Sequence, residues 1–150
     1  ERDKEAYKEN DSLRSPTYIL NLLKKLGDKK CSLCDCEIPQ IIHGAHIYPV
    51  ATIKKVTNIN QDKKLRLAID GDNGIWLCNN HHKLFDLNIL YIASDGRLKQ
   101  KRKIELKHEV YIKGITVAKQ LHTDILTSTF IDYLDKRNKY LDSKEYSFVV

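Results

Sequence analysis

Two short clusters of cysteine and histidine constrain the fold of this chain most strongly. The first is Cys31-x-x-Cys34, and the second, far along the chain, is Cys78-x-x-His81. Thiolates and imidazoles are the ligands of tetrahedral Zn²⁺ in structural sites, and the two clusters together supply the four that it needs. The alternative is a buried free thiol at Cys36 or Cys78, because free cysteine is among the most buried residue types. The paired spacing favours zinc, with Cys36 as a spare thiol that can compete with Cys34 for the ion.

The bulk composition predicts a folded, heavily charged chain. Its 150 residues suffice for one domain, and 41% of them are hydrophobic and 31% charged. No apolar run approaches the roughly 20 residues of a membrane helix, and we recognise no signal peptide. Clustered cysteines in such a chain favour metal ligation in a reducing cytoplasm over disulfides. Because the chain begins at Glu1 and contains no methionine, we expect a piece of a longer protein.

The first half of the chain predicts a helix followed by a β-rich centre. Residues 1–14 are polar and predict a frayed helix or a linker. The next helix is expected to have Ser15 as its cap, Pro16 in its first turn and Gly27 at its end. Its buried stripe is expected to comprise Ile19, Leu22, Leu23 and Leu26. The centre is expected to comprise a β segment over residues 41–50, a polar connection over 51–72 with a short helix around 63–69, a strand at 75–77 and about two helical turns over 78–88.

The second half predicts a hairpin, further strands and a closing helix. The hairpin spans residues 89–100 and turns at Asp95-Gly96. Residues 103–117 are expected to continue in strands. A helix over residues 123–141 closes the chain, and its apolar face is expected to contain Leu126, Phe130, Tyr133 and Leu134. This order of elements predicts an α+β fold.

The adjacent histidines His81 and His82 raise a problem of direction. Neighbours on a helix point about 100° apart, so the two rings cannot comfortably share one ion. Either one ring is incidental or each serves a different site. If His81 completes the zinc site, His82 faces elsewhere, one turn before Asp86. That pair can hold a divalent ion such as Mg²⁺ or Mn²⁺, or form a surface ion pair.

The stretch GAHIYPV, followed by DNGIWLCNNHHKLFD, resembles the HNH endonucleases of the ββα-metal type over about residues 31–86. The family pattern is a histidine before an apolar residue, a central asparagine, and a histidine or asparagine nine residues on. Here these are His46, Asn73 and His82. Many members also carry a zinc site of two C-x-x-C hooks around this core, and His81 stands where a cysteine is usual. The flanks are more weakly similar to restriction-type nuclease domains.

The resemblance implies a ββα-metal core with a structural zinc site, flanked by N- and C-terminal helices and a β-hairpin. We therefore expect residues 1–150 to be a single HNH nuclease domain. Its parts would be a helical lead-in over residues 1–30, the zinc-bound core over 31–90, and the hairpin and C-terminal helix over 91–150.

The resemblance also implies roles for individual residues. His46 would be the general base, since an imidazole with an ordinary pKa near 6.5 can take a proton from water at neutral pH. An ion on His82 would stabilise charge on the scissile phosphate, and Asn73 would brace the loop that carries the base. Asp86 matches a position that some relatives use as a further ligand.

Ala45 departs from the family pattern, because the residue before the base is usually an Asp or His that binds the ion. Three alternatives follow. The ion is held by His82 and Asp86 together with phosphate oxygens and water, or another side chain reaches in, or catalysis is weakened. The candidates for the second alternative are His43, Asp70 and Asp72. Related AHI variants exist among restriction-type nucleases, so Ala45 does not by itself mark a dead site.

The net charge of +6 favours a polyanionic partner, although many basic proteins bind nothing specific. The candidate phosphate contacts are Lys54, Lys55, Arg97, Lys99, Lys101 and Arg102. A solvated strand face is the alternative interpretation of the cluster from residue 97 onward.

We therefore expect an endonuclease that cleaves double-stranded DNA, with structural Zn²⁺ and catalytic Mg²⁺ or Mn²⁺. We expect it to act in the cytoplasm of a prokaryote as the catalytic domain of a restriction or other defence enzyme, with target recognition elsewhere in the full-length protein, no membrane partner, and a homodimer as one option. The rival is a non-catalytic zinc module that binds nucleic acid or protein. The zinc ligands suit both hypotheses, whereas His46, Asn73 and His82 suit only the enzyme.

Overall fold

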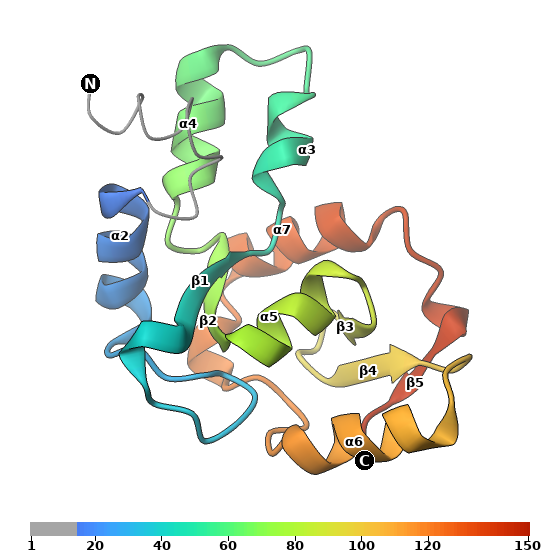
Figure 1. Ribbon diagram of the computed structural model, residues 1–150. Coiled ribbons are helices and arrows are strands. Elements are labelled where there is room, and N and C mark those ends of the chain that lie inside the picture. The colour runs from blue at the N-terminus through green and yellow to red at the C-terminus, as the bar shows by residue number, and fades with distance from the viewer. Residues whose placement is uncertain (1–14) are drawn as a thin grey trace.

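The computed structural model describes residues 15–150, so the expectation for residues 1–14 lies outside the described part (Figure 1). The first described helix, α2, spans Pro16–Leu26 and has the predicted ends. The Ser15 hydroxyl accepts a hydrogen bond from Tyr18 N at 3.4 Å, and Gly27 ends the helix with a φ of +79°. The predicted buried stripe is only partly right. Tyr18 and Leu22 are buried, whereas Leu23 is 38% exposed, because the helix turns its Tyr18 side toward the strands.

The centre of the fold is an antiparallel strand pair followed directly by a helix. Strand β1, Ile42–His46, pairs with β2, Gly74–Cys78, and places His46 opposite Gly74. Helix α5, Asn79–Asp86, begins where β2 ends. Helices α2 and α5 both contact the strand pair, and Figure 1 shows α2 and α5 on different sides of it. The strand–strand–helix core predicted by the resemblance is confirmed.

Two helices occupy the long connection between β1 and β2. Helix α4, Gln61–Ile69, is the short helix expected there, and the Asn60 side chain caps it by accepting from Lys63 N at 2.8 Å. Helix α3, Val50–Lys54, was not expected; it begins after Pro49, which cannot donate a backbone hydrogen bond to a strand.

The predicted hairpin is confirmed, but it belongs to a larger sheet. Strands β3, Leu90–Ile92, and β4, Leu98–Lys101, are antiparallel, and Gly96 in the turn has a φ of +87°. A third strand, β5, Tyr146–Phe148, pairs with the other edge of β4. The prediction that a helix closes the chain is therefore wrong. Helix α7, Ser128–Asn138, ends before β5, and Leu126 lies outside it, although Phe130, Tyr133 and Leu134 are buried as predicted.

The prediction of strands over residues 103–117 is also wrong, because this segment contains helix α6, Leu106–Ile115. Its β-branched and aromatic residues favour strands, but only Ile112 within the helix is buried. A strand that buries one face needs a buried side chain at every second position. A helix can instead pack on the core through one side chain, here that of Ile112. Glu109 and Lys113, four residues apart, form an ion pair of 3.0 Å along the helix surface. Short 3₁₀ turns at Pro39–Ile41, Thr123–Ile125 and Ser143–Glu145 complete the described elements.

Over residues 15–150, no helix is both long enough and apolar enough to span a bilayer.

Candidate functional site

The four predicted zinc ligands come together at the junction of β2 and α5. The Sγ atoms of Cys31, Cys34 and Cys78 and a ring nitrogen of His81 all lie within 4.8 Å of one another. Cys34 Sγ is 3.8 Å from Cys78 Sγ, and His81 Nδ1 is 3.3 Å from Cys78 Sγ. Ligands of a tetrahedral zinc ion are about 3.4–3.8 Å apart, so the group fits this ion. Among the described residues Cys36 is outside the group; its carbonyl instead accepts a hydrogen bond from Cys31 N.

A second contact fixes which nitrogen of His81 faces the thiols. Its Nε2 is 3.0 Å from the Thr116 hydroxyl, and both side chains are buried. When Nε2 carries the proton and donates it to Thr116, the Nδ1 lone pair points toward the cysteines. Burial lowers the pKa of His81, which keeps the ring neutral, and raises that of Cys34 to about 12. Metal binding must therefore displace thiol protons. Thr116 was not among the predicted site residues, because it follows helix α6, which the sequence did not predict.

His46 stands at the end of β1 with one ring nitrogen held and the other free. Its Nε2 is 2.7 Å from the carbonyl oxygen of Ala68 in α4. Its Nδ1 is buried and has no hydrogen-bond partner anywhere in the described chain. Since a carbonyl can only accept, Nε2 carries the proton and Nδ1 presents a lone pair. The ring also stacks on Tyr18, with centroids 4.1 Å apart and planes inclined by 14°.

Burial is the main reason that the pKa of His46 falls to about 4. The hydrogen bond to Ala68 opposes this shift, and the neighbouring His82 adds to it. The imidazole is therefore neutral at physiological pH and is able to accept a proton. The ordinary pKa near 6.5 that we assumed from the sequence does not hold here, because the sequence does not reveal burial.

Asn73 ties the loop after β1 to the end of α4. Its Oδ1 accepts from Tyr48 N at 2.7 Å, and its Nδ2 donates to the carbonyls of Tyr48 and Leu67, each at 3.1 Å. The side chain is fully buried. Because α4 also provides the carbonyl that holds His46, Asn73 is placed to brace the surroundings of that ring.

His82 and His81 have different surroundings despite being adjacent. His82 Nε2 is 3.2 Å from a carboxylate oxygen of Asp86, and its Nδ1 is 2.8 Å from Nδ1 of His43 on β1. Burial lowers the pKa of His82, whereas Asp86 opposes the shift. Three side chains were considered as substitutes for the metal ligand that Ala45 cannot provide. Of these, His43 is the one in contact with His82. Asp70 accepts from the Tyr133 hydroxyl, and Asp72 pairs with Lys25 at 2.9 Å.

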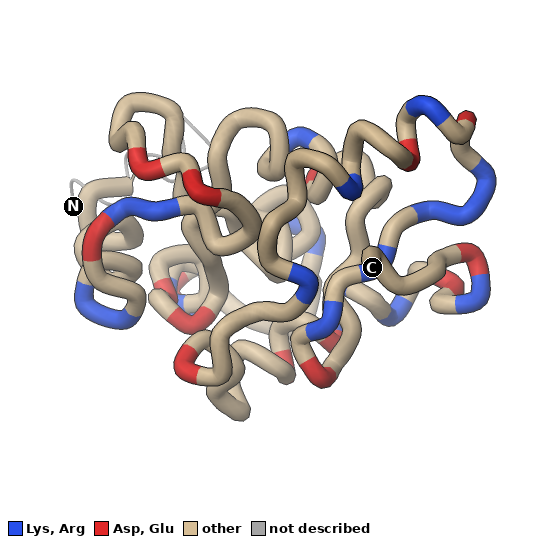
Figure 2. Tube along the Cα trace, turned by 90° about the horizontal axis from the view of Figure 1, so that it is seen from below, with Lys and Arg blue, Asp and Glu red and all other residues tan. Residues whose placement is uncertain are grey.

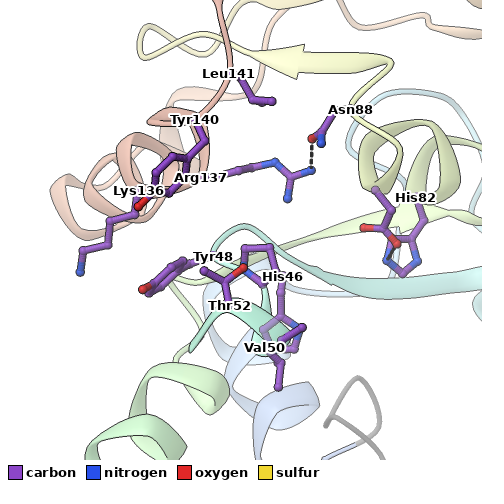
Figure 3. Close-up of a pocket in the computed structure, with 13 residues that line it drawn as sticks. His46, Tyr48, Val50, Thr52, His82, Asn88, Lys136, Arg137, Tyr140 and Leu141 are labelled. Carbon is purple, nitrogen blue, oxygen red and sulfur yellow. Dashed lines mark hydrogen bonds and ion pairs between the residues drawn. The ribbon is translucent and has the colours of Figure 1, made fainter. Parts of the chain in front are cut away.

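A cavity of about 450 Å³ connects the two predicted catalytic histidines (Figure 3). Its lining includes His46, His82 and Asp86 from the core and Lys136 and Arg137 from α7. A second hollow shares Tyr48, Thr52, Lys136 and Tyr140 with this cavity, and its further basic residues are Lys55 and Lys139. We call this second hollow the basic groove.

Arg137 is a charged group of the cavity that the sequence analysis missed. Its guanidinium donates to the carbonyls of Ile47 and Phe85, at 3.2 and 2.7 Å, and to Asn88 Oδ1 at 3.1 Å, as the dashed line in Figure 3 marks. All three acceptors are neutral. Burial lowers the pKa of Arg137 to about 10, so the group stays charged at neutral pH. The only signal in the sequence is that Arg137 is a basic residue within the expected C-terminal helix over residues 123–141.

The predicted phosphate contacts fall into two separate places. Lys54 ends α3, and Lys55, next to it, lines the basic groove. The remaining four lie on or beside β4, outside the lining of both described hollows. There, Arg97 pairs with Asp95 at 2.8 Å, Lys99 lies over the Phe148 ring, and Arg102 donates to Tyr146 O. A contact with DNA stays a prediction for all four of these residues, Arg97, Lys99, Lys101 and Arg102.

Comparison with known protein families gives a match to part of the chain. Residues 31–93 match the family described as HNH endonuclease. No curated protein matches the chain. The matched segment includes both zinc hooks, the strand pair, α5 and β3, whereas α7 with Lys136 and Arg137 lies outside it.

Proposed function

We propose, on the premise that residues 31–93 match the HNH endonuclease family, that the protein is a metal-dependent endonuclease that hydrolyses DNA phosphodiester bonds. The observation that carries the proposal is the free Nδ1 of His46. It is buried, it lacks a partner within residues 15–150, and its ring lines the same cavity as His82 and Arg137. An orphaned buried acceptor costs folding free energy, and its retention beside a cavity is typical of a catalytic base.

The chemistry follows from the residues that line the cavity. Nδ1 of His46 takes a proton from a water molecule, whose oxygen forms a new bond to phosphorus as the bond to the leaving sugar oxygen breaks. The leaving oxygen takes up a proton from solvent. Ala68 and Tyr18 hold the imidazole in place during this transfer. Arg137 provides fixed positive charge toward the phosphate. A divalent ion at His82 would supply further stabilisation of the charge that develops on the phosphate oxygens.

We assign the approach of the DNA backbone to the basic groove. Lys55, Lys136 and Lys139 surround it, and it shares lining residues with the cavity of His46. Lysines arranged in this way bind phosphates without reading sequence. Tyr48 and Tyr140 add aromatic surface, and Tyr140 is 80% exposed. Base-specific recognition would then come from elsewhere in the full-length protein. This agrees with a role as the catalytic part of a restriction or other defence enzyme, for which the resemblance of the flanking sequence is the support.

A plasmid-nicking assay tests the proposal. Supercoiled DNA is incubated with Mg²⁺ or Mn²⁺ and the wild type, His46→Ala or His108→Ala. We expect His46→Ala to cleave about 10²–10⁴ times more slowly, because general base catalysis contributes about this factor. His108, whose side chain is 59% exposed on α6, is the matched control and should have no effect.

Cleavage by His46→Ala at the wild-type rate would refute the assignment of the base. Absence of cleavage by the wild type with every divalent ion would instead favour the non-catalytic zinc module.

A further inference from the structure

His43 lies beside His82. The ligand set expected from the sequence was His82 with Asp86, and His43 was one of three side chains considered as a substitute for the ligand missing at Ala45. We propose that Nδ1 of His43 and Nδ1 of His82 together bind the divalent ion, and that Asp86 orients His82 instead of ligating the ion. This inference rests on the proposed function. In it, His43 takes the place of the ligand that is missing at Ala45.

The pleat of β1 explains why His43 can take this place. Side chains two residues apart on a strand point to the same face, so His43 and Ala45 share one face of β1. The contact between His43 and His82 shows that this face is turned toward α5. The methyl group of Ala45 is fully buried and cannot ligate an ion. The imidazole of His43, two residues earlier on the same face, is long enough to reach α5.

The distances fit a shared ion. The two Nδ1 atoms are 2.8 Å apart, with the rings inclined at 76°. Two imidazole nitrogens that bind one ion at about 2.1 Å each, at right angles, are about 3 Å apart. Insertion of an ion therefore requires a small separation of the rings and a shift of the His43 proton from Nδ1, where it bridges the two rings, to Nε2. His43 is exposed, so this movement meets little resistance from packing.

Asp86 acts on the opposite nitrogen of His82. Because the carboxylate lies 3.2 Å from Nε2, that nitrogen carries the proton and the lone pair of the neutral ring is on Nδ1. A carboxylate that holds the far nitrogen of a metal-bound histidine is a recurrent arrangement, and it raises the basicity of the ligand. The carboxylate is thus committed to the proton of His82, on the side of the ring away from His43.

Two imidazole ligands also determine which ion is preferred. Mg²⁺ favours oxygen ligands and retains its water, whereas Mn²⁺, Co²⁺ and Ni²⁺ accept imidazole nitrogen more readily. We therefore infer a preference for transition-metal ions over Mg²⁺ at this site, which narrows the expectation of Mg²⁺ or Mn²⁺.

Binding of Mn²⁺ to the zinc-loaded protein tests the ligand set without reference to activity. Calorimetry measures affinity, and electron spin-echo spectroscopy counts the coordinated imidazoles. The wild type should show two. His43→Ala should show one and bind about 100-fold more weakly, because loss of an outer-shell partner alone costs about 10–100-fold. Asp86→Asn, whose amide oxygen can still accept from Nε2, should keep two imidazoles and lose about tenfold. Unchanged zinc content establishes that each variant is folded.

The opposite pattern overturns the inference: His43→Ala binds Mn²⁺ like the wild type, while Asp86→Asn binds none. Cleavage with a single coordinated imidazole in the wild type would refute the His43 assignment and leave the proposed function intact. Two coordinated imidazoles in a protein that cleaves no DNA would support the ligand assignment and refute the proposed function.

Discussion

At the scale of single residues, the group next to Nε2 determines the tautomer of each of three histidines of the site. In all three rings this nitrogen is within hydrogen-bond distance of an oxygen atom, which leaves the Nδ1 lone pair available. The rings are His46, His81 and His82, and the oxygens belong to Ala68, Thr116 and Asp86, respectively. In our proposal, this shared arrangement suits His46 for proton transfer, His81 for a structural ion and His82 for a second ion, according to what lies opposite Nδ1.

The sequence predicts the histidines better than it predicts the groups that hold them. Spacing and resemblance single out His46 and both zinc hooks, because the proposed chemistry requires those side chains. Ala68 contributes only a backbone carbonyl, which any residue would provide, so its identity carries no signal. Thr116 contributes a hydroxyl whose position depends on how α6 ends. Arg137 is one of many basic residues, and only its position in the fold distinguishes it.

The lowered pKa of His46 predicts an unusual pH dependence. The base form exists above a pKa of about 4, so it is lost only as the pH falls through that value. With saturating Mn²⁺, cleavage at pH 6.0 should remain close to its rate at pH 7.5. A histidine with an ordinary pKa near 6.5 would be only about one-quarter neutral at pH 6.0. Initial rates of plasmid nicking over this range provide the measurement, and an acid limb centred near pH 6.5 would contradict the assignment of His46 as a buried base.

At the scale of elements, glycine allows α2 to approach the strand pair closely. A Cβ at Gly74 would meet the Tyr18 hydroxyl and lie 3.0 Å from Tyr18 Cζ. Tyr18 is fully buried and stacks on His46, so it has little room to move. The distance between α2 and β2 therefore sets the position of the Tyr18 ring that stacks on His46.

Substitution of Gly74 by alanine tests this packing. We expect Gly74→Ala to lower the free energy of unfolding by about 1–3 kcal/mol, the usual cost of overpacking, and to slow cleavage by displacing Tyr18. Gly114 in α6 is the matched control, since a Cβ there meets nothing within 4 Å. Gly114→Ala should stabilise the helix by about 0.5–1 kcal/mol. Urea unfolding of both variants decides between these outcomes, and equal effects at the two positions would show that α2 does not constrain the strands.

Elements with local signals are predicted well, and those that depend on distant partners are not. The ends of α2 are encoded by Ser15, Pro16 and Gly27, and the hairpin by its Asp-Gly turn. Strand β5 forms only because β4 offers a free edge to a segment far along the chain. Helix α6 contains residues that favour strands, but it finds no strand partner among the described residues and buries Ile112 instead.

At the scale of the whole molecule, the candidate site is assembled from both ends of the described chain. The core supplies His46 and His82, α2 supplies the ring that stacks on His46, and α7 supplies Arg137 and one wall of the cavity (Figure 1). The net charge of +6 is a difference between many cations and anions, and Figure 2 shows both signs distributed along the chain. Net charge alone thus could not identify the basic groove, which combines Lys55 with residues of α7.

The separation of the two adjacent histidines into different metal sites is the central claim, and zinc content measured by native mass spectrometry tests it most directly. His82→Ala should retain the zinc content of the wild type and remain folded, yet fail to cleave DNA. His81→Ala should lose zinc and unfold the centre of the chain, because structural zinc contributes folding free energy directly. Equal loss of zinc from both variants would contradict the claim.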